Sequence, residues 1–170
     1  FSRLNAQTNT VFFEAWAKSG GSSPTQAQNE LLERVATVTD ANGNLFVASS
    51  TYNESTQVHD LLLEKSDGSG TLIWKNQFNI TGGGDVLVGD LTLNANGSPV
   101  FTGAVLNGSN SYDALTVKFT DAGAVSWNAT WNGAANGYDG GASVTTDASG
   151  NIYVSGISTV NSVSRDFLTI

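Results

Sequence analysis

A short unit occurs three times in this chain, and an internal repeat restricts the fold more than any other feature of a sequence. The copies start at Thr39, Leu93 and Thr146 and read TDANGNLFVAS, LNANGSPVFTG and TDASGNIYVSG. In each copy an Asp or Asn stands three residues before a glycine, and a run rich in Val, Phe, Tyr or Ile follows, a pattern typical of a tight β-hairpin. The repeat therefore predicts a fold built from β-hairpins.

The period of the repeat is about 53 residues. The hairpin glycines Gly43, Gly97 and Gly150 are separated by 54 and 53 residues, and Trp74 and Trp127 are 53 residues apart. Such a period is too long for one rung of a β-solenoid and suits a four-stranded blade of a β-propeller. We therefore expect an all-β fold: a β-propeller segment of about three four-stranded blades, cut within a blade at both ends.

The expected strands follow the repeat. They span residues 34–40, 44–52, 59–65 and 71–79, then 88–94, 98–106, 112–119 and 124–132, then 141–147, 151–159 and 165–170. The corresponding units are the end of a blade at 1–17, an inserted loop or short helix at 18–34, blades at 35–79 and 80–132, and a blade without its last strand at 133–170. Pro99 falls at the start of its strand, where a missing N–H donor is tolerated.

The chain begins and ends at one phase of the repeat. Phe1 and Ser2 correspond to Thr169 and Ile170, inside the third strand of a unit. A strand severed at this point leaves backbone groups unpaired. We therefore expect the chain either to be part of a longer array or to be continued by a second copy in a homo-oligomeric ring, where a head-to-tail dimer would have six blades.

The last strand of each unit carries two large aromatic residues four positions apart, so both rings lie on one face of the strand. We expect these rings to pack between neighbouring blades, where burying each one stabilises the fold by about 2 to 3 kcal/mol. The pairs are Phe12 with Trp16, Trp74 with Phe78, and Trp127 with Trp131.

The run from Asp113 to Gly156 resembles the β-propeller repeats of the SBBP type, which are found mostly in secreted and surface-exposed bacterial proteins. It contains the strand Asp-Ala-Leu-Thr, a tryptophan after the next turn, an Asn-Gly stretch, and then Asp-Ala-Ser-Gly-Asn followed by Tyr-Val-Ser-Gly. The resemblance extends to Ile170 and is looser over residues 35–79, and Asn94 and Pro99 depart from the pattern. It implies an extracellular or cell-surface location and no catalytic residues.

Charge and composition exclude several classes of function. The chain has 15 Asp and Glu residues against 7 Lys and Arg residues, so it lacks the basic surface that nucleic acid requires. It has no cysteine, which excludes disulfides, thiolate nucleophiles and cysteine-based zinc sites. No run of 18 apolar residues occurs, so we expect no membrane insertion.

Calcium is the only cofactor that the residue spacing suggests. Oxygen-bearing residues at positions i, i+2 and i+4 resemble the first half of a calcium loop, but no bidentate glutamate follows at the required distance. We therefore favour a hairpin-turn role for these residues over a metal role. The weak calcium candidates are Asp40, Asn42 and Asn44, and Asp147, Ser149 and Asn151.

Repeated carboxylates and a single histidine give no catalytic site. Asp60, Asp113 and Asp166 recur in every unit, so we expect a structural role in which they accept backbone hydrogen bonds from a neighbouring loop. His59 is the only histidine, and no nucleophile motif supports a Ser-His-Asp triad around it. We expect His59 to be exposed at a strand edge, and we predict that the chain is not an enzyme.

Residues near strand ends are the candidates for a ligand surface. Aromatic and carboxylate groups together bind sugars by stacking and by hydrogen bonds to hydroxyl groups. The candidates are Tyr52, Tyr112, Tyr138 and Asp139. Five Asn-x-Ser/Thr sequons, candidate sites of glycosylation, begin at Asn53, Asn79, Asn96, Asn107 and Asn128.

The sequence thus predicts a non-enzymatic extracellular structural or interaction module, part of a propeller-repeat surface, adhesion or filament protein. Its expected partner is a protein or a polysaccharide at the cell surface. The alternatives are a carbohydrate-binding module and the accessory propeller of a secreted hydrolase.

Overall fold

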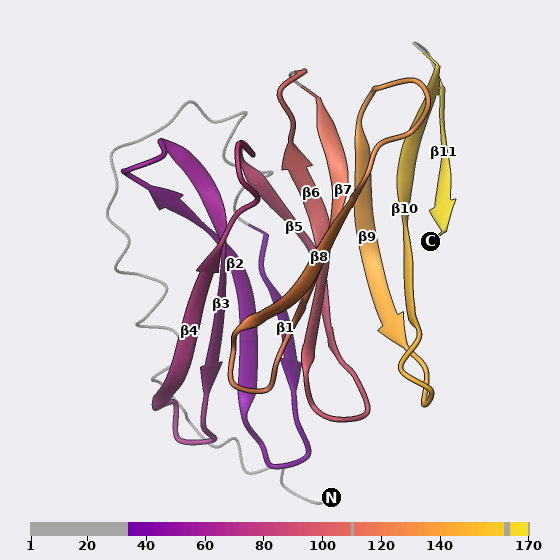
Figure 1. Cartoon of the computed structure of the whole chain (residues 1–170). Coiled ribbons are helices and arrows are strands. Elements are labelled where there is room, and N and C mark those ends of the chain that lie inside the picture. The colour runs from indigo at the N-terminus through magenta and orange to yellow at the C-terminus, as the bar shows by residue number, and fades with distance from the viewer. Residues whose placement is uncertain (1–33, 110, 162–163, 170) are drawn as a thin grey trace, which may run out of the picture.

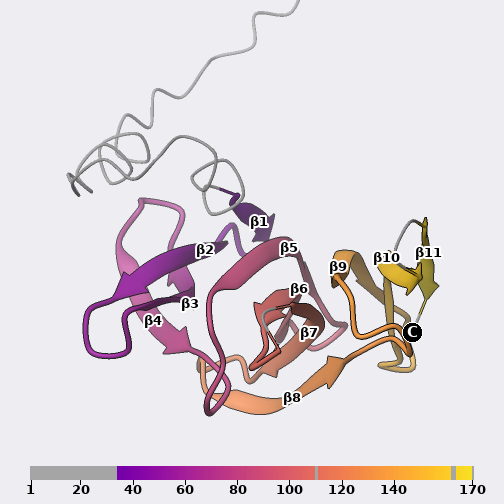
Figure 2. The same ribbon diagram turned by 90° about the horizontal axis from the view of Figure 1, so that it is seen from above.

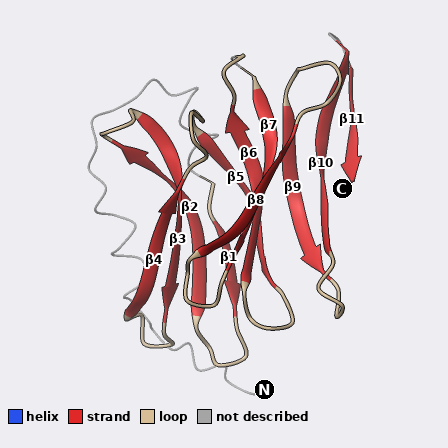
Figure 3. Ribbon diagram, viewed as in Figure 1, coloured by secondary structure: helices blue, strands red, loops and turns tan. Residues whose placement is uncertain are grey.

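A computed structural model describes residues 34–109, 111–161 and 164–169, and in this part of the chain every regular element is a β-strand (Figures 1 and 3). The first sheet contains β1 (Ala36–Thr39), β2 (Leu45–Asn53), β3 (Val58–Ser66) and β4 (Leu72–Phe78). The second contains β5 (Val86–Leu93), β6 (Pro99–Leu106), β7 (Tyr112–Phe119) and β8 (Val125–Trp131). The third contains β9 (Asp139–Thr146), β10 (Ile152–Asn161) and β11 (Ser164–Thr169).

Each sheet is an antiparallel meander in which strands adjacent in the sequence pair with each other. The register of the second sheet repeats in the third: Ala104 lies opposite Ala114, and Ile157, 53 residues later, lies opposite Phe167. The all-β prediction is therefore confirmed. The predictions for residues 1–17 and for 18–33, including the short helix, lie outside the described residues.

Two strands start earlier than predicted. β5 begins at Val86 and β9 at Asp139, each two residues before the expected start. The reason is a β-bulge in each of these strands, at Gly89 between Val88 and Asp90 in β5 and at Ala142 between Gly141 and Ser143 in β9; on the far side of each bulge the ladder continues. The hydrophobic pattern changes phase at a bulge, so the pattern alone placed the start of each strand too late.

The hairpin turns have the geometry that the repeat predicts. Asp40 accepts hydrogen bonds at Oδ1 from the backbone N–H groups of Asn42 and Asn44, both at 2.9 Å, and its own N–H donates to the carbonyl oxygen of Asn44. Gly43 has a φ of 80°, which favours glycine at this position. The same arrangement occurs in the turns that start at Asp67, Asn94 and Asp147.

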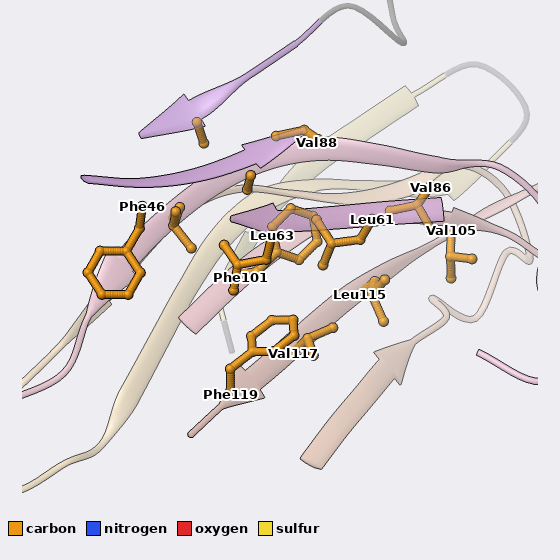
Figure 4. Close-up of a cluster of buried hydrophobic side chains, with 13 residues drawn as sticks. Phe46, Leu61, Leu63, Val86, Val88, Phe101, Val105, Leu115, Val117 and Phe119 are labelled. Carbon is orange, nitrogen blue, oxygen red and sulfur yellow. The ribbon is translucent and has the colours of Figure 1, made fainter. Parts of the chain in front are cut away.

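The three sheets stand side by side in chain order (Figure 2), and the first strand of each sheet lies beside the first strand of the next. Within the described residues the sheets do not close into a ring. A buried cluster joins the first sheet to the second (Figure 4), and it includes Phe46, Leu61, Leu63, Phe101, Leu115, Val117 and Phe119. The opposite face of the second sheet packs on the third through Val100, which contacts Val144 and Val154.

The aromatic residues of the last strands differ in their surroundings. The ring of Trp74 lies edge-on to that of Phe46, with ring centroids 5.9 Å apart. Its Nε1 donates a 3.1 Å hydrogen bond to the carbonyl oxygen of Asp121, between β7 and β8 of the second sheet. This contact between two sheets is the one predicted for Trp74. Trp127 is 39% exposed, and with Trp131 it lines a groove of about 210 Å³ between the second and third sheets.

Candidate functional site

The loops β2–β3, β4–β5, β6–β7 and β8–β9 lie at one end of the sheets, the upper end in Figure 1, and several aromatic residues lie in or beside these loops. We use the name aromatic row for Tyr52, His59, Tyr112 and Tyr138, together with Asp85. Tyr52 and His59 face each other across β2 and β3, with ring centroids 5.3 Å apart. The strand register therefore fixes the first pair of the row.

His59 joins the first sheet to the second. Its backbone N–H donates to Asp85 Oδ1 at 2.7 Å, and its ring Nδ1 lies 3.0 Å from the same oxygen. The side chain of His59 is 29% exposed, and the pairing of β3 with β4 starts only at Leu61. The histidine is therefore only partly exposed and not free in solvent as predicted, because Asp85 from the β4–β5 connection lies against the ring.

Tyr112 and Tyr138 form the second half of the row. Their ring centroids are 5.7 Å apart with an interplanar angle of 52°. Burial raises the pKa of Tyr112, and the negative charge of Asp85 and the proximity of Tyr138 raise it further. Tyr112 therefore remains protonated at neutral pH and keeps its hydroxyl group as a hydrogen-bond donor.

Asp139 does not belong to the ligand surface that the sequence predicted. Its side chain is completely buried and accepts hydrogen bonds from the N–H groups of Gly133 at 2.8 Å and Thr159 at 3.2 Å. Thr159 also donates to the carbonyl oxygen of Tyr138 through its N–H and its hydroxyl group. Asp139 thus fixes the β8–β9 connection on β10 and holds the backbone that carries Tyr138.

Two of the three repeated carboxylates, Asp60 and Asp113, accept hydrogen bonds within the fold, but from other donors than predicted; the side chain of Asp166 lies outside the described part of the chain. Asp60 is 4% exposed and accepts hydrogen bonds from the side-chain amides of Asn53, Gln77 and Asn79 at 2.7 to 2.9 Å. Asp113 accepts a 2.6 Å bond from the amide of Asn107. The expected backbone donors are therefore replaced by side-chain amides from the adjoining strand ends.

The environment of Asp60 shifts its pKa in two opposing directions. Burial disfavours the charged form, and the three amide donors favour it; the donors together outweigh burial, so the pKa of Asp60 lies below 3.8. The group therefore adds stability to the folded state above the pKa of the unfolded chain. That contribution is lost as the pH falls below about 3.8 and through the folded pKa.

We expect Asp60→Asn to lower the free energy of unfolding by about 2 kcal/mol at pH 7, because an amide cannot accept all three donors. Urea denaturation at pH 7 and pH 3 should also show that the variant loses less stability on acidification than the wild type does. Glu54→Gln, at an exposed carboxylate, is the control. Equal acid sensitivity in the wild type and Asp60→Asn would contradict this role.

The predicted glycosylation sites fall into two groups. Asn53, Asn79 and Asn107 use their Nδ2 atoms, to which a glycan would be attached, as hydrogen-bond donors to the carboxylates of Asp60 and Asp113. Asn96 and Asn128 are exposed. A glycan is therefore compatible with the last two positions, whereas at the first three it would be attached to the side-chain nitrogen of a half-buried residue, and that nitrogen already contacts a carboxylate.

The weak calcium candidates lie in two hairpin turns. Both carboxylate oxygens of Asp40 accept N–H groups, and Asp147 does the same while also accepting the hydroxyl group of Tyr153. The side-chain hydrogen bond from Asn44 is the main cause that lowers the pKa of Asp40, and that from Asn151 lowers the pKa of Asp147. Among the described residues no group of three or more His, Asp or Glu side chains is placed to hold a metal ion.

Sequence reasoning missed Asp85, although the repeat contains a signal for it. Asp85 and Asp139 are 54 residues apart, just before or at the first strand of a unit, and each accepts backbone hydrogen bonds from a more distant segment. The amide donors to Asp60 had only a partial signal: Asn79 has an identical residue one period later, Asn132, whereas Gln77 corresponds to Thr130.

Comparison with known proteins identifies no relative: no family model and no curated protein matches the chain. None of the described residues forms a helix that could cross a membrane.

Proposed function

We propose that this chain is a non-enzymatic interaction module of the β-propeller type, displayed outside the cell or at the cell surface, and that the aromatic row binds its partner. Consecutive four-stranded meanders with a period of about 53 residues, and first strands that lie side by side, support the propeller assignment. The resemblance to SBBP-type repeats supports the location.

One observation carries the binding proposal: aromatic side chains from the first sheet, the second sheet and the β8–β9 connection lie at the same end of the strands. Tyr52 is 52% exposed there, and buried carboxylates hold the strand ends beneath the row. Aromatic side chains on a fixed backbone contribute large contact areas and lose little conformational entropy on binding. The row therefore has the composition of a protein-binding surface.

A second candidate function is carbohydrate binding, and the Tyr112–Tyr138 pair favours it. The two tilted rings offer apolar faces to a sugar ring, and the protonated hydroxyl of Tyr112 offers a donor. The acidic neighbour Asp85 adds an acceptor for sugar hydroxyl groups.

Binding of the full chain to a glycan array and to a panel of immobilised extracellular matrix proteins tests both candidates. We expect Tyr52→Ala and Tyr112→Ala to weaken binding at least about tenfold, since truncated aromatic anchors typically cost that much. Trp127→Ala, at an exposed aromatic residue on the outer strand β8, serves as the control. Binding to the glycan array would identify a carbohydrate partner, and binding to the panel would identify a protein partner. Unchanged binding by both tyrosine variants would refute the role of the aromatic row.

A further inference from the structure

The outer face of the third sheet exposes apolar side chains at positions that are buried in the second sheet. Tyr153 and Ile157 in β10 are 47% and 39% exposed. Their counterparts one period earlier in β6, Val100 and Ala104, are 0% and 2% exposed. The two pairs have the same register, so the difference arises from what lies against each face.

The internal packing of the chain shows what covers such a face. Val100 of the second sheet contacts Val144 in β9 and Val154 in β10 of the third sheet. One period before Val154, Phe101 packs in the same way against the first sheet. In both cases an apolar residue of the second strand of one sheet packs against the facing side of the preceding sheet.

The residue that continues this series is Val47 in β2, which corresponds to Phe101 and Val154. Leu62 in β3 lies on the same face of the first sheet, because it pairs with Ser49, two residues beyond Val47. Both side chains are half-buried. The Val47–Leu62 face of the first sheet is therefore equivalent to the faces that cover a preceding sheet. Among the described residues, no such face covers the outer face of the third sheet.

We propose that the Tyr153–Ile157 face of the third sheet docks against the Val47–Leu62 face of the first sheet in a second copy of this chain. The contact is head-to-tail, since it joins two different faces. Two copies joined by two such contacts bring six of the described sheets into one ring, within the range of four to eight blades that propellers adopt.

Sedimentation equilibrium of the full chain over a range of concentrations is the primary test. We expect a species of twice 17.7 kDa. Ile157→Asp should raise its dissociation constant at least about tenfold, because the charge would be buried in an apolar contact. Tyr52→Ala, an exposed aromatic on the opposite face of the first sheet, should leave the constant unchanged. A monomer at every concentration, or a dimer unaffected by Ile157→Asp, would overturn the proposal.

A mixing experiment tests the head-to-tail geometry. Ile157→Asp damages one face and Leu62→Asp the other, so each variant alone should be monomeric. Their mixture should regain a dimer, because one of its two contacts pairs an unaltered third sheet with an unaltered first sheet. Val47→Asp replaces Leu62→Asp if the latter fails to fold by circular dichroism. A mixture that stays monomeric, or a symmetric dimer that resists Leu62→Asp, would refute head-to-tail docking.

Discussion

Phe101→Ala should lower the free energy of unfolding by about 4 kcal/mol, within the range measured for buried phenylalanines. Phe101 is fully buried on β6, and Figure 4 places it among side chains from both the first and the second sheet. Its removal would leave a cavity between two sheets, each held by its own ladder of hydrogen bonds. Urea denaturation followed by tryptophan fluorescence gives the change in the free energy of unfolding.

Tyr52→Ala is the control for this substitution, because it removes an aromatic ring that is 52% exposed. The expected loss is below about 1 kcal/mol. A loss for Phe101→Ala no larger than for Tyr52→Ala would mean that the first two sheets do not share a core.

The parts of the fold that are predictable from the sequence are those that depend on neighbours along the chain. The turn at Asp40 involves only residues up to Asn44, so an Asp and a glycine three positions apart suffice to predict it. The order of the strands followed from repeating this unit. The bulge at Gly89 was missed because it depends on the contact between β5 and the third sheet.

The candidate site depends on distant residues, which explains why sequence reasoning recovered only part of it. The three tyrosines were predicted from their places near strand ends, and two of them form a pair. Asp139 shared that location but is buried, because Thr159, 20 residues away, donates to it. The exposure of His59 was overestimated for the same reason, since its partner Asp85 is 26 residues away.

The difference in burial between the second and the third sheet links the fold to the docking proposal. β6 in the middle sheet is buried on both faces, whereas β10 in the third sheet alternates between buried and exposed positions over the described side chains. The two strands have the same register and spacing. The replacement of the buried Val100 by the exposed Tyr153 therefore reflects the different surroundings of the two faces. A large side chain with a polar tip suits a face that is wet in one copy and covered in an assembly.

Gly89→Ala should lower the free energy of unfolding by about 3 kcal/mol, the upper part of the usual range for overpacking. A Cβ atom at Gly89 would overlap the carbonyl oxygen of Gly141 in the third sheet and lie 2.8 Å from that of Thr102. Neither backbone atom can rotate away, so β5 and β9 would have to separate.

Gly108→Ala is the matched control, because no atom lies within 4 Å of its new Cβ, and it should change stability by less than about 0.5 kcal/mol. Thermal and urea denaturation of both variants distinguish the cases: equal stability of the two variants would mean that β5 and β9 do not approach as closely as the structure has them at Gly89 and Gly141.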